Sequence, residues 1–239
     1  MLNQLKNTIQ STGFSFIKSN LFKRLLTVSI LNDWPAFVAS WQQMPLDEYM
    51  ADGGRYRRRR HAVLSANHEA IQLEPHQPHF QSRDYNNLNG GIPRLFDAIP
   101  RVIVQGETFQ TIVNFCNHIF SDLSGHKHWH IEAHQFRIEA SQQQHGNPTP
   151  EGVHRDGVDY VLVMMVKREN ISSGTTEMFN LNKQLLGSFT LTEALDCAFV
   201  DDHRCFHGVT PVEQIDVIKP AFRDVLVITF KKINVPFIE

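Results

Sequence analysis

The feature that most constrains the fold is a change of hydrophobic periodicity near residue 127. Beyond it, apolar residues alternate with polar ones or form short β-branched and aromatic runs, as in HWHIEAHQFRIEA, DYVLVMMVK, ALDCAFVDD and RDVLVITF. Glycine, asparagine, proline and serine separate these runs. Short strands spaced in this way are typical of an antiparallel sandwich or barrel, so the second half is predicted to be a β-core.

The first half of the chain predicts helices and loops. The opening residues carry leucine and isoleucine at helical spacing, GFSFIKS is a candidate strand, and Asp33 before Trp34-Pro35 predicts a helix N-cap. A further helix is expected from Glu107 to Phe120, where apolar residues form one face. Residues 52–91 contain glycine pairs, prolines and asparagines, which predict long loops around one or two strands.

The length and composition of the chain fit one domain. With 239 residues and 41% hydrophobic content, the chain is long enough to bury a sizeable core. It contains neither an internal repeat nor a low-complexity linker. We therefore expect a single α+β domain over residues 1–239, with a helical, loop-rich part to about residue 125 packed on a β-core from about 127 to 239.

The charge balance and the few cysteines restrict partners and location. Lys plus Arg number 23 against 25 Asp plus Glu, so the net charge of −2 predicts neither nucleic acid nor an anionic membrane as partner. The three cysteines have no CxxC spacing, and no run approaches the roughly 18 apolar residues of a membrane span. We expect a cytoplasmic protein with a small-molecule partner.

The segment PEGVHRDGVDY predicts part of a metal site. Residues i and i+2 of a strand point the same way, so His154 and Asp156 would present an imidazole and a carboxylate side by side. An iron(II) site for oxygen chemistry needs two histidines and one carboxylate on one side. The second histidine has two candidates, His203 and His207, in VDDHRCFHGVTPV.

Arg223 adds a fourth element to this constellation. It opens the strand-like segment RDVLVITF, and a buried strand rarely carries an arginine without an anionic partner because an unpaired buried charge is costly. A guanidinium binds a carboxylate through two parallel hydrogen bonds. His, Asp, His and Arg on short strands therefore indicate a metal centre beside an anion site.

These segments resemble the iron(II)- and 2-oxoglutarate-dependent dioxygenases, whose core is a double-stranded β-helix, a jelly-roll variant. The stretch from Pro150 to about 211 and the terminal FRDVLVITF look like the branch of bacterial hydroxylases that act on free aliphatic amino acids, and YNNLNGGIPRLF and HQFRIEA are similar to further segments of it. The resemblance covers roughly residues 50–239. It implies a jelly-roll core with flanking N-terminal helices.

The resemblance also implies the cofactors and the roles of particular residues. His154, Asp156 and His207 would hold iron(II), and Arg223 would pair with the distal carboxylate of 2-oxoglutarate. Dioxygen and 2-oxoglutarate would be cosubstrates, and a C–H bond of a free amino acid would be hydroxylated with release of succinate and CO2. An aspartate at position 156 disfavours halogenation, since halogenating members leave that position empty for chloride.

The run RYRRRRHAV has three interpretations. Strand alternation would split its arginines between two faces, which favours an ion-paired surface over a nucleic-acid site. The third interpretation is that an inward arginine, Arg57 or Arg59, binds the carboxylate of the substrate. We keep these two residues as substrate-binding candidates.

The segment SGHKHWHIEAHQFRIEA is a candidate strand with two different faces. His126, His128, His130 and His134 would share one face, which we interpret as a polar face or as hydrogen-bond donors around the site because no cysteine or aspartate completes a second metal set. Arg137 lies on the other face. It is a second candidate for a carboxylate contact, with a structural ion pair as the alternative.

Two other functions remain open from the sequence. A jelly-roll sensor or binding protein would keep the metal ligands without performing oxidation, although it would have no use for Arg223. The same chemistry on a peptide or another metabolite is the other possibility. In DYVLVMMVK, the sequence leaves open whether the set beginning at Tyr160 or the set beginning at Val161 faces the substrate.

Overall fold

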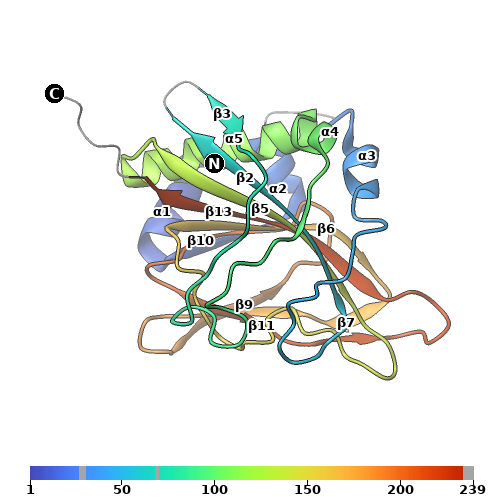
Figure 1. The fold of residues 1–239 in the computed structure, drawn as a ribbon. Coiled ribbons are helices and arrows are strands. Elements are labelled where there is room, and N and C mark those ends of the chain that lie inside the picture. Colours follow the sequence, from blue (N-terminus) through green and yellow to red (C-terminus); the bar gives the residue numbers. More distant parts are fainter. Residues whose placement is uncertain (27–30, 68–69, 234–239) are drawn as a thin grey trace.

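The computed structural model describes residues 1–26, 31–67 and 70–233 (Figure 1). The helices and strands, in chain order, are α1 Leu2–Thr12, β1 Phe14–Ile17, α2 Ser19–Leu25, α3 Trp34–Ala39, β2 Arg57–Ala66, β3 Ile71–Leu73, β4 Asp97–Ala98, α4 Arg101–Val104, α5 Glu107–Ser124, β5 Trp129–Glu139, β6 Tyr160–Glu169, β7 Ile171–Ser173, β8 Thr175–Phe179, β9 Leu185–Thr190, β10 Cys197–Asp201, β11 Phe206–Val209, β12 Val212–Gln214 and β13 Phe222–Lys232.

The strands form one large sheet and two small ones. The large sheet has the order β1-β10-β6-β13-β5-β2-β3, with β4 beside β2, and the small sheets are β11-β8-β9 and β12-β7. Every pair is antiparallel except β2 with β4. The prediction of an antiparallel core is confirmed, and the fold is the jelly roll that the resemblance implied.

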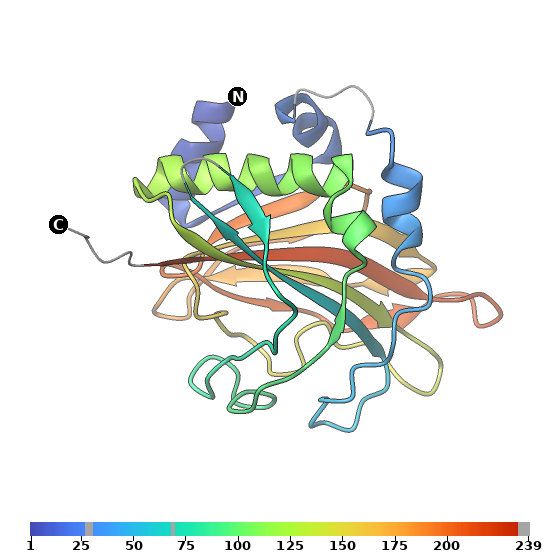
Figure 2. The same ribbon diagram turned by 45° about the horizontal axis from the view of Figure 1, so that its top comes forward.

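The helices cover one face of the large sheet. Figure 2 shows α5 lying across this face with α1 and α2 behind it, while the small sheets lie below the other face. Alternation along β6 explains the division: Tyr160, Leu162, Met164 and Val166 join the buried cluster with the helices. Val161 and Val163 point the other way, toward a cavity. The sequence left undecided which of these two sets faces inward. In the structure, the set that begins at Val161 lines the cavity.

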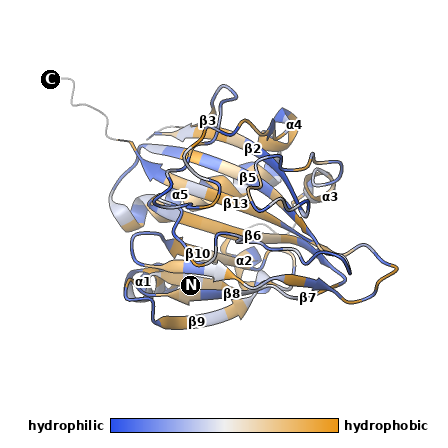
Figure 3. Ribbon diagram, turned by 60° about the horizontal axis from the view of Figure 1, so that its bottom comes forward, coloured by the Kyte–Doolittle hydropathy of each residue, from blue (hydrophilic) through white to orange (hydrophobic). Residues whose placement is uncertain are grey.

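Hydrophobic colour follows the central strands β6, β10 and β13 in Figure 3. These strands are buried on both faces for much of their length, as the burial of β6 and β10 shows. Such strands read as nearly continuous apolar runs in the sequence. None of the helices within the described ranges is long and apolar enough to cross a membrane.

Asp33 caps a different helix from the one predicted. It stands at the N-cap position of α3, but its side chain makes no capping hydrogen bond there. Instead, its Oδ1 accepts hydrogen bonds from the backbone N–H of Thr108 at 2.9 Å and from the Thr108 hydroxyl at 2.5 Å, at the start of α5. The prediction that Asp33 is a capping residue is correct, but the helix that it caps is α5. A cap from a distant segment leaves no local pattern in the sequence.

The arginine run lies on β2, and its two faces have separate environments. Arg57 and Arg59 are each 5% exposed and line the cavity. On the other face, Arg58 donates to Glu139 Oε1 at 2.8 Å and Arg60 donates to the carbonyl of Ser40 at 3.0 Å. The predicted split of the arginines between two faces is confirmed.

Candidate active site

A cavity of about 360 Å³ lies between the large sheet and β8 and β11 of a small one. Its walls come from β5, β6, β10 and β13 on one side, and the segment 79–94 covers part of it. Ligand sites of this size, largely apolar with a few convergent polar groups, are typical of enzymes. The lining includes the histidines, carboxylates and arginines at positions 154, 156, 207, 132, 57, 59 and 223.

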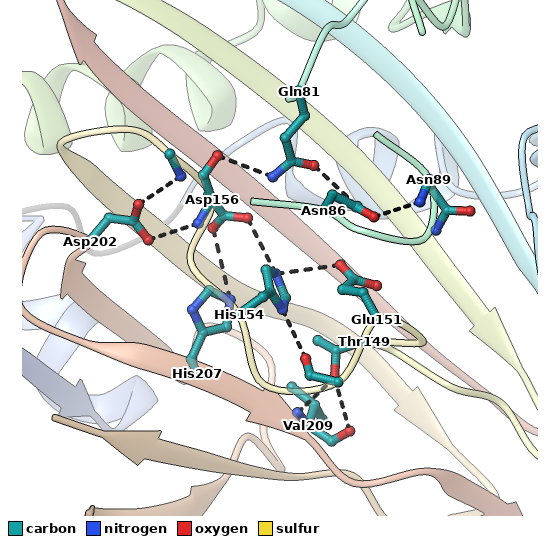
Figure 4. Close-up of polar contacts among 12 residues, drawn as sticks. Gln81, Asn86, Asn89, Thr149, Glu151, His154, Asp156, Asp202, His207 and Val209 are labelled. Atoms are coloured by element: carbon teal, nitrogen blue, oxygen red, sulfur yellow. Dashed lines mark hydrogen bonds and ion pairs between the residues drawn. The ribbon is translucent and has the colours of Figure 1, made fainter. Parts of the chain in front are cut away.

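His154, Asp156 and His207 converge at one end of the cavity. His154 and His207 are direct partners across two extended segments, since the backbone N–H of each donates to the carbonyl of the other at 2.9 Å. The Nε2 atoms of His154 and His207 lie 3.5 Å and 3.8 Å from the carboxylate oxygens of Asp156. Figure 4 shows the three side chains pointing toward one another.

This arrangement fits a metal ion. Atoms bound to one first-row metal at ~2.1 Å lie roughly 3 Å apart or more, and both nitrogen–oxygen distances satisfy that condition. Two imidazoles and one carboxylate on the same side form the donor set of non-haem iron oxygenases. The Nδ1 of His207 has no hydrogen-bond partner among the described residues.

The electrostatics of these three residues also suit a cation. Burial alone would raise the pKa of Asp156, but the hydrogen bond from His154 and the charge of His207 lower it, so the carboxylate is ionised. Burial acts to lower the pKa of His154, yet Asp156 and Glu151 together raise it to about 9. Burial lowers the pKa of His207 to about 4. The carboxylates of Asp156 and Glu151 that favour a proton on His154 would also attract a metal cation in place of that proton.

Asp202 holds the loop that carries Asp156. Its carboxylate accepts hydrogen bonds from the backbone N–H groups of Asp156, Gly157 and Val158 at 2.9, 2.8 and 3.1 Å. Gly157 has φ of 79°, and a Cβ there would lie 2.5 Å from the ring of Tyr85. This close approach in the left-handed region explains why a glycine follows Asp156 directly.

Segment 79–94 reaches over the site from the large sheet. Gln81 donates from Nε2 to the backbone carbonyl of Asp156 at 3.0 Å, and Asn86 donates to Gln81 Oε1 at 3.1 Å (Figure 4). Asn86 and Asn89 are 5% and 4% exposed. The sequence indicated only a loop here, because neither residue type nor spacing shows where a loop will fold back.

Arg223 lines the cavity from β13. It is 2% exposed, and its Nε and Nη1 have no hydrogen-bond partner within the described part of the chain. Burial and the neighbouring Arg168 lower the pKa of Arg223 to about 10, which leaves it charged at neutral pH. A buried guanidinium with unused donors is a site for an anion from outside the chain.

The two substrate-binding candidates on β2 have different partners. Arg57 forms an ion pair with Asp47, with Nε and Nη2 both 2.8 Å from Oδ2. The guanidinium carbon of Arg59 lies 4.0 Å from the centre of the Phe96 ring and 4.6 Å from that of Phe136. Arg57 is thus neutralised within the chain, whereas no carboxylate of the described residues lies in hydrogen-bond range of Arg59.

Arg137 and His203 lie outside the cavity. Arg137 donates from Nε and Nη2 to the two oxygens of Asp224 at 2.7 and 2.8 Å, on the opposite face of β5. This is the structural ion pair that the sequence offered as its alternative, and the placement gives no support to a carboxylate contact. His203 lies 3.0 Å from Asp159 Oδ1, away from Asp156.

The sequence missed a second cluster, of which His79, Glu132 and His134 line the same cavity and His61 does not. Glu132 Oε2 lies 2.6 Å from His79 Nδ1, 3.4 Å from His134 Nε2 and 3.7 Å from His61 Nε2. His130 Nε2 lies 3.3 Å from Oε1. The signal was present, because Glu132 stands midway between His130 and His134 on the same strand face, but the prediction took only aspartate or cysteine as the residue that would complete a metal set. His126 and His128 precede β5.

Comparison with known proteins identifies the family. The sequence model of the 2OG-Fe dioxygenase family matches residues 38–229. The chain belongs to this family, whose members are enzymes that use iron(II), 2-oxoglutarate and dioxygen.

Two named relatives and one crystal structure are similar to most of this chain. The chain is 23% identical over 230 residues to 3(1)-hydroxy-L-isoleucine 4-dioxygenase of Pantoea ananatis, covering 92% of each protein. It is 27% identical over 162 residues to L-isoleucine-4-hydroxylase of Bacillus thuringiensis, covering 66% of this chain and 67% of that protein. The crystal structure of a bsmA homologue from Methylobium petroleophilum PM1 superposes with a TM-score of 0.89 at 29% identity, over 98% of this chain and 95% of that one.

Proposed function

We propose that this dioxygenase hydroxylates a C–H bond of a free, aliphatic L-amino acid, with His154, Asp156 and His207 as iron ligands and Arg223 as the partner of the distal carboxylate of 2-oxoglutarate. One observation carries the proposal: a single cavity joins three convergent ligand atoms to a buried arginine with unused donors. A metal-binding protein without oxidation chemistry has no need for the second feature.

The residues of the chain would bind, orient and shield the reactants. Iron(II) with 2-oxoglutarate and dioxygen supplies the oxidising power for converting C–H to C–OH, with succinate and CO2 as coproducts. Arg223 would fix one end of 2-oxoglutarate, so that the other end reaches the His154–Asp156–His207 end of the cavity. Val161, Val163 and Val227 line the cavity and exclude water, which protects a reactive site from side reactions.

Two observations support an amino acid as substrate. The relatives named above are named for isoleucine and its hydroxylated form, and the apolar wall of the cavity suits an aliphatic side chain. The size of the cavity, about 360 Å³, matches a small molecule together with 2-oxoglutarate better than a folded peptide segment.

The test is turnover with defined substrates. Purified protein is loaded with iron(II) and 2-oxoglutarate without oxygen, exposed to oxygen, and assayed for succinate with each free amino acid in turn, beside a His154→Ala control. The proposal predicts succinate that rises with an aliphatic amino acid, together with a product heavier by one oxygen atom. Succinate unaffected by any amino acid would overturn the substrate class, and absence of iron-dependent succinate would favour a binding protein.

A further inference from the structure

The cluster around Glu132 places a carboxylate in a cavity whose lining also includes Arg59, Arg94 and Lys231. Glu132 and the ring nitrogens of His61, His79 and His134 lie within 4.8 Å of one another. Burial would raise the pKa of Glu132, but hydrogen bonds with the surrounding histidines lower it far below its usual value. Its carboxylate is therefore a fixed negative charge that faces the substrate space.

The hydrogen-bond pattern argues against a second metal ion in this cluster. Arg59 Nη2 lies 3.1 Å from His134 Nδ1, and because arginine only donates, that nitrogen must be the acceptor. The proton of neutral His134 then sits on Nε2, which leaves no lone pair for a metal. His79 Nδ1 and Glu132 Oε2 are 2.6 Å apart, closer than the roughly 3 Å between two ligands of one ion, so they share a hydrogen bond.

His61 lies beside Glu132 but is not among the residues that line the cavity. It is fully buried, and neither of its ring nitrogens has a hydrogen-bond partner in the described part of the chain. Burial lowers its pKa, so the ring is neutral and one nitrogen is a bare acceptor. Its Nε2 faces Glu132 Oε2 across 3.7 Å, beyond hydrogen-bond range. An ammonium group in the cavity carries three N–H bonds and can donate to the carboxylate of Glu132, which does line it.

An unused cation stands beside this acidic group. Arg94 is 1% exposed, lines the cavity, and has no hydrogen-bond partner for Nε and Nη2 among the described residues. His79 and Arg94 are direct backbone partners, each N–H donating to the other carbonyl at 2.9 Å. Cα atoms in such a pair are roughly 5.5 Å apart, so the acidic and basic groups are close neighbours.

We propose that Glu132 binds a protonated amine of the substrate and that Arg94 binds its carboxylate, so that this end of the cavity recognises a zwitterion. This inference rests on the proposed function and specifies which groups of the substrate the chain reads. The amine is either the α-amino group, which every free amino acid has, or an amine on the side chain. A blocked peptide offers neither end.

The test compares Glu132→Gln and Arg94→Gln with wild type and with Glu139→Gln, which changes the same group on the same strand, β5, but on the face outside the cavity. The amino acid that gives most succinate in the panel is titrated by calorimetry into protein holding manganese(II) and 2-oxoglutarate. Its N-acetyl derivative, its amide and L-ornithine are titrated in parallel. Thermal melts verify that each variant is folded.

The proposal predicts a dissociation constant raised about 10- to 100-fold in Glu132→Gln and unchanged in Glu139→Gln. If Glu132 binds the α-amine, the N-acetyl derivative should bind weakly, and with equal affinity, to wild type and Glu132→Gln. Tight binding of ornithine alone would instead assign the site to a side-chain amine. The amide should lose its dependence on Arg94. Arg94→Gln keeps the proposal testable should Glu132→Gln fail to fold.

Three outcomes would overturn the inference. An affinity that Glu132→Gln leaves within twofold of wild type removes the amine site while the amino-acid hydroxylase stands. If wild type instead binds two equivalents of manganese, and the second equivalent persists in His154→Ala and disappears in Glu132→Gln, the cluster is a metal site. Turnover of some other metabolite, with no amino acid bound, removes the proposed function itself.

Discussion

Asp202 accepts the backbone N–H of Asp156 at 2.9 Å while the Asp156 carboxylate faces His154 and His207. One carboxylate thus positions the main chain of another. Asp202 is 2% exposed, and burial with the charge of Asp156 raises its pKa to about 6. Asp156 lies on a loop before β6, so the position of this candidate ligand depends on its buried neighbour.

Replacing Asp202 should therefore weaken metal binding without removing a ligand. In Asp202→Ala the three N–H donors lose their acceptor, and we expect iron(II) affinity to fall about 10- to 100-fold, as for other partners of metal ligands. Competition with a chelator measures the change. The control is Asp201→Asn at the neighbouring position, where the wild-type carboxylate accepts one backbone N–H, from His203. Equal affinity in Asp202→Ala and wild type would contradict the role.

Arg223→Met should separate cosubstrate binding from metal binding. Removing one partner of a buried charge pair costs about 2–5 kcal/mol, so the dissociation constant for 2-oxoglutarate should rise at least ~30-fold. Iron affinity in the absence of 2-oxoglutarate should stay at the wild-type value. Arg223→Lys should recover part of the loss, since it restores the charge without the paired donors. Anaerobic titration of the iron-loaded protein with 2-oxoglutarate measures the first quantity, and competition with a chelator measures the iron affinity.

Arg137→Met should give the reverse pattern. It leaves Asp224, which is 1% exposed, without its bidentate partner, and breaking such a pair costs roughly 3–5 kcal/mol of unfolding free energy. Affinity for 2-oxoglutarate should not change, because the side chain lies on the other face of β5. Urea unfolding measures the loss of stability, and the same anaerobic titration measures the affinity for 2-oxoglutarate. Weaker 2-oxoglutarate binding with full stability would restore Arg137 as a cosubstrate residue.

Asp196 should make stability depend on pH. It is fully buried, and its carboxylate accepts the backbone N–H groups of Ser19, Thr192 and Glu193 at 2.9, 3.0 and 3.1 Å. Burial opposes ionisation, but these bonds and Lys18 lower its pKa below the usual 3.8. A lowered pKa stabilises the fold above pH 3.8, and that contribution is lost as pH falls through the folded-state value.

Asp196→Asn should accordingly cost about 1–3 kcal/mol of unfolding free energy at pH 7 and less at pH 3. Urea denaturation at both pH values measures the two differences. Asp84→Asn, at an exposed position, should change neither. A difference from wild type that is the same at both pH values would mean that the carboxylate charge plays no part.

The elements were predictable where the pattern is local. The strand alternation beyond residue 127, the helix near residues 107–120 and the first strand at GFSFIKS all appear in the structure. The split of Arg57 and Arg59 from their neighbours followed from the same alternation. These features depend on which residues lie one or two positions apart, and the sequence displays that directly.

Features that join distant segments were not predictable in this way. Asp33 caps a helix that begins at Glu107, and Arg94 enters the cavity from a loop that has no periodicity. Glu132 faces His61 and His79 only because β5 pairs with β2 and segment 79–94 folds back. Such neighbours depend on strand order, which a single sequence does not state. The candidate ligands His154 and His207 could be proposed from the sequence because a family resemblance supplied that pairing.

The four arginines of β2 have a consequence for insertions and deletions. Because the four side chains are identical, they cannot distinguish one register of β2 from the next. The flanking Tyr56 and His61 must therefore set which arginines face inward. Loss of any one arginine codon gives the same protein, and with His61 kept in place it would bring Tyr56 to the position of Arg57. The net positive charge of the strand would fall by only one. Yet Asp47 would lose its ion-pair partner, and the phenol that now donates to Asp52 would occupy the cavity.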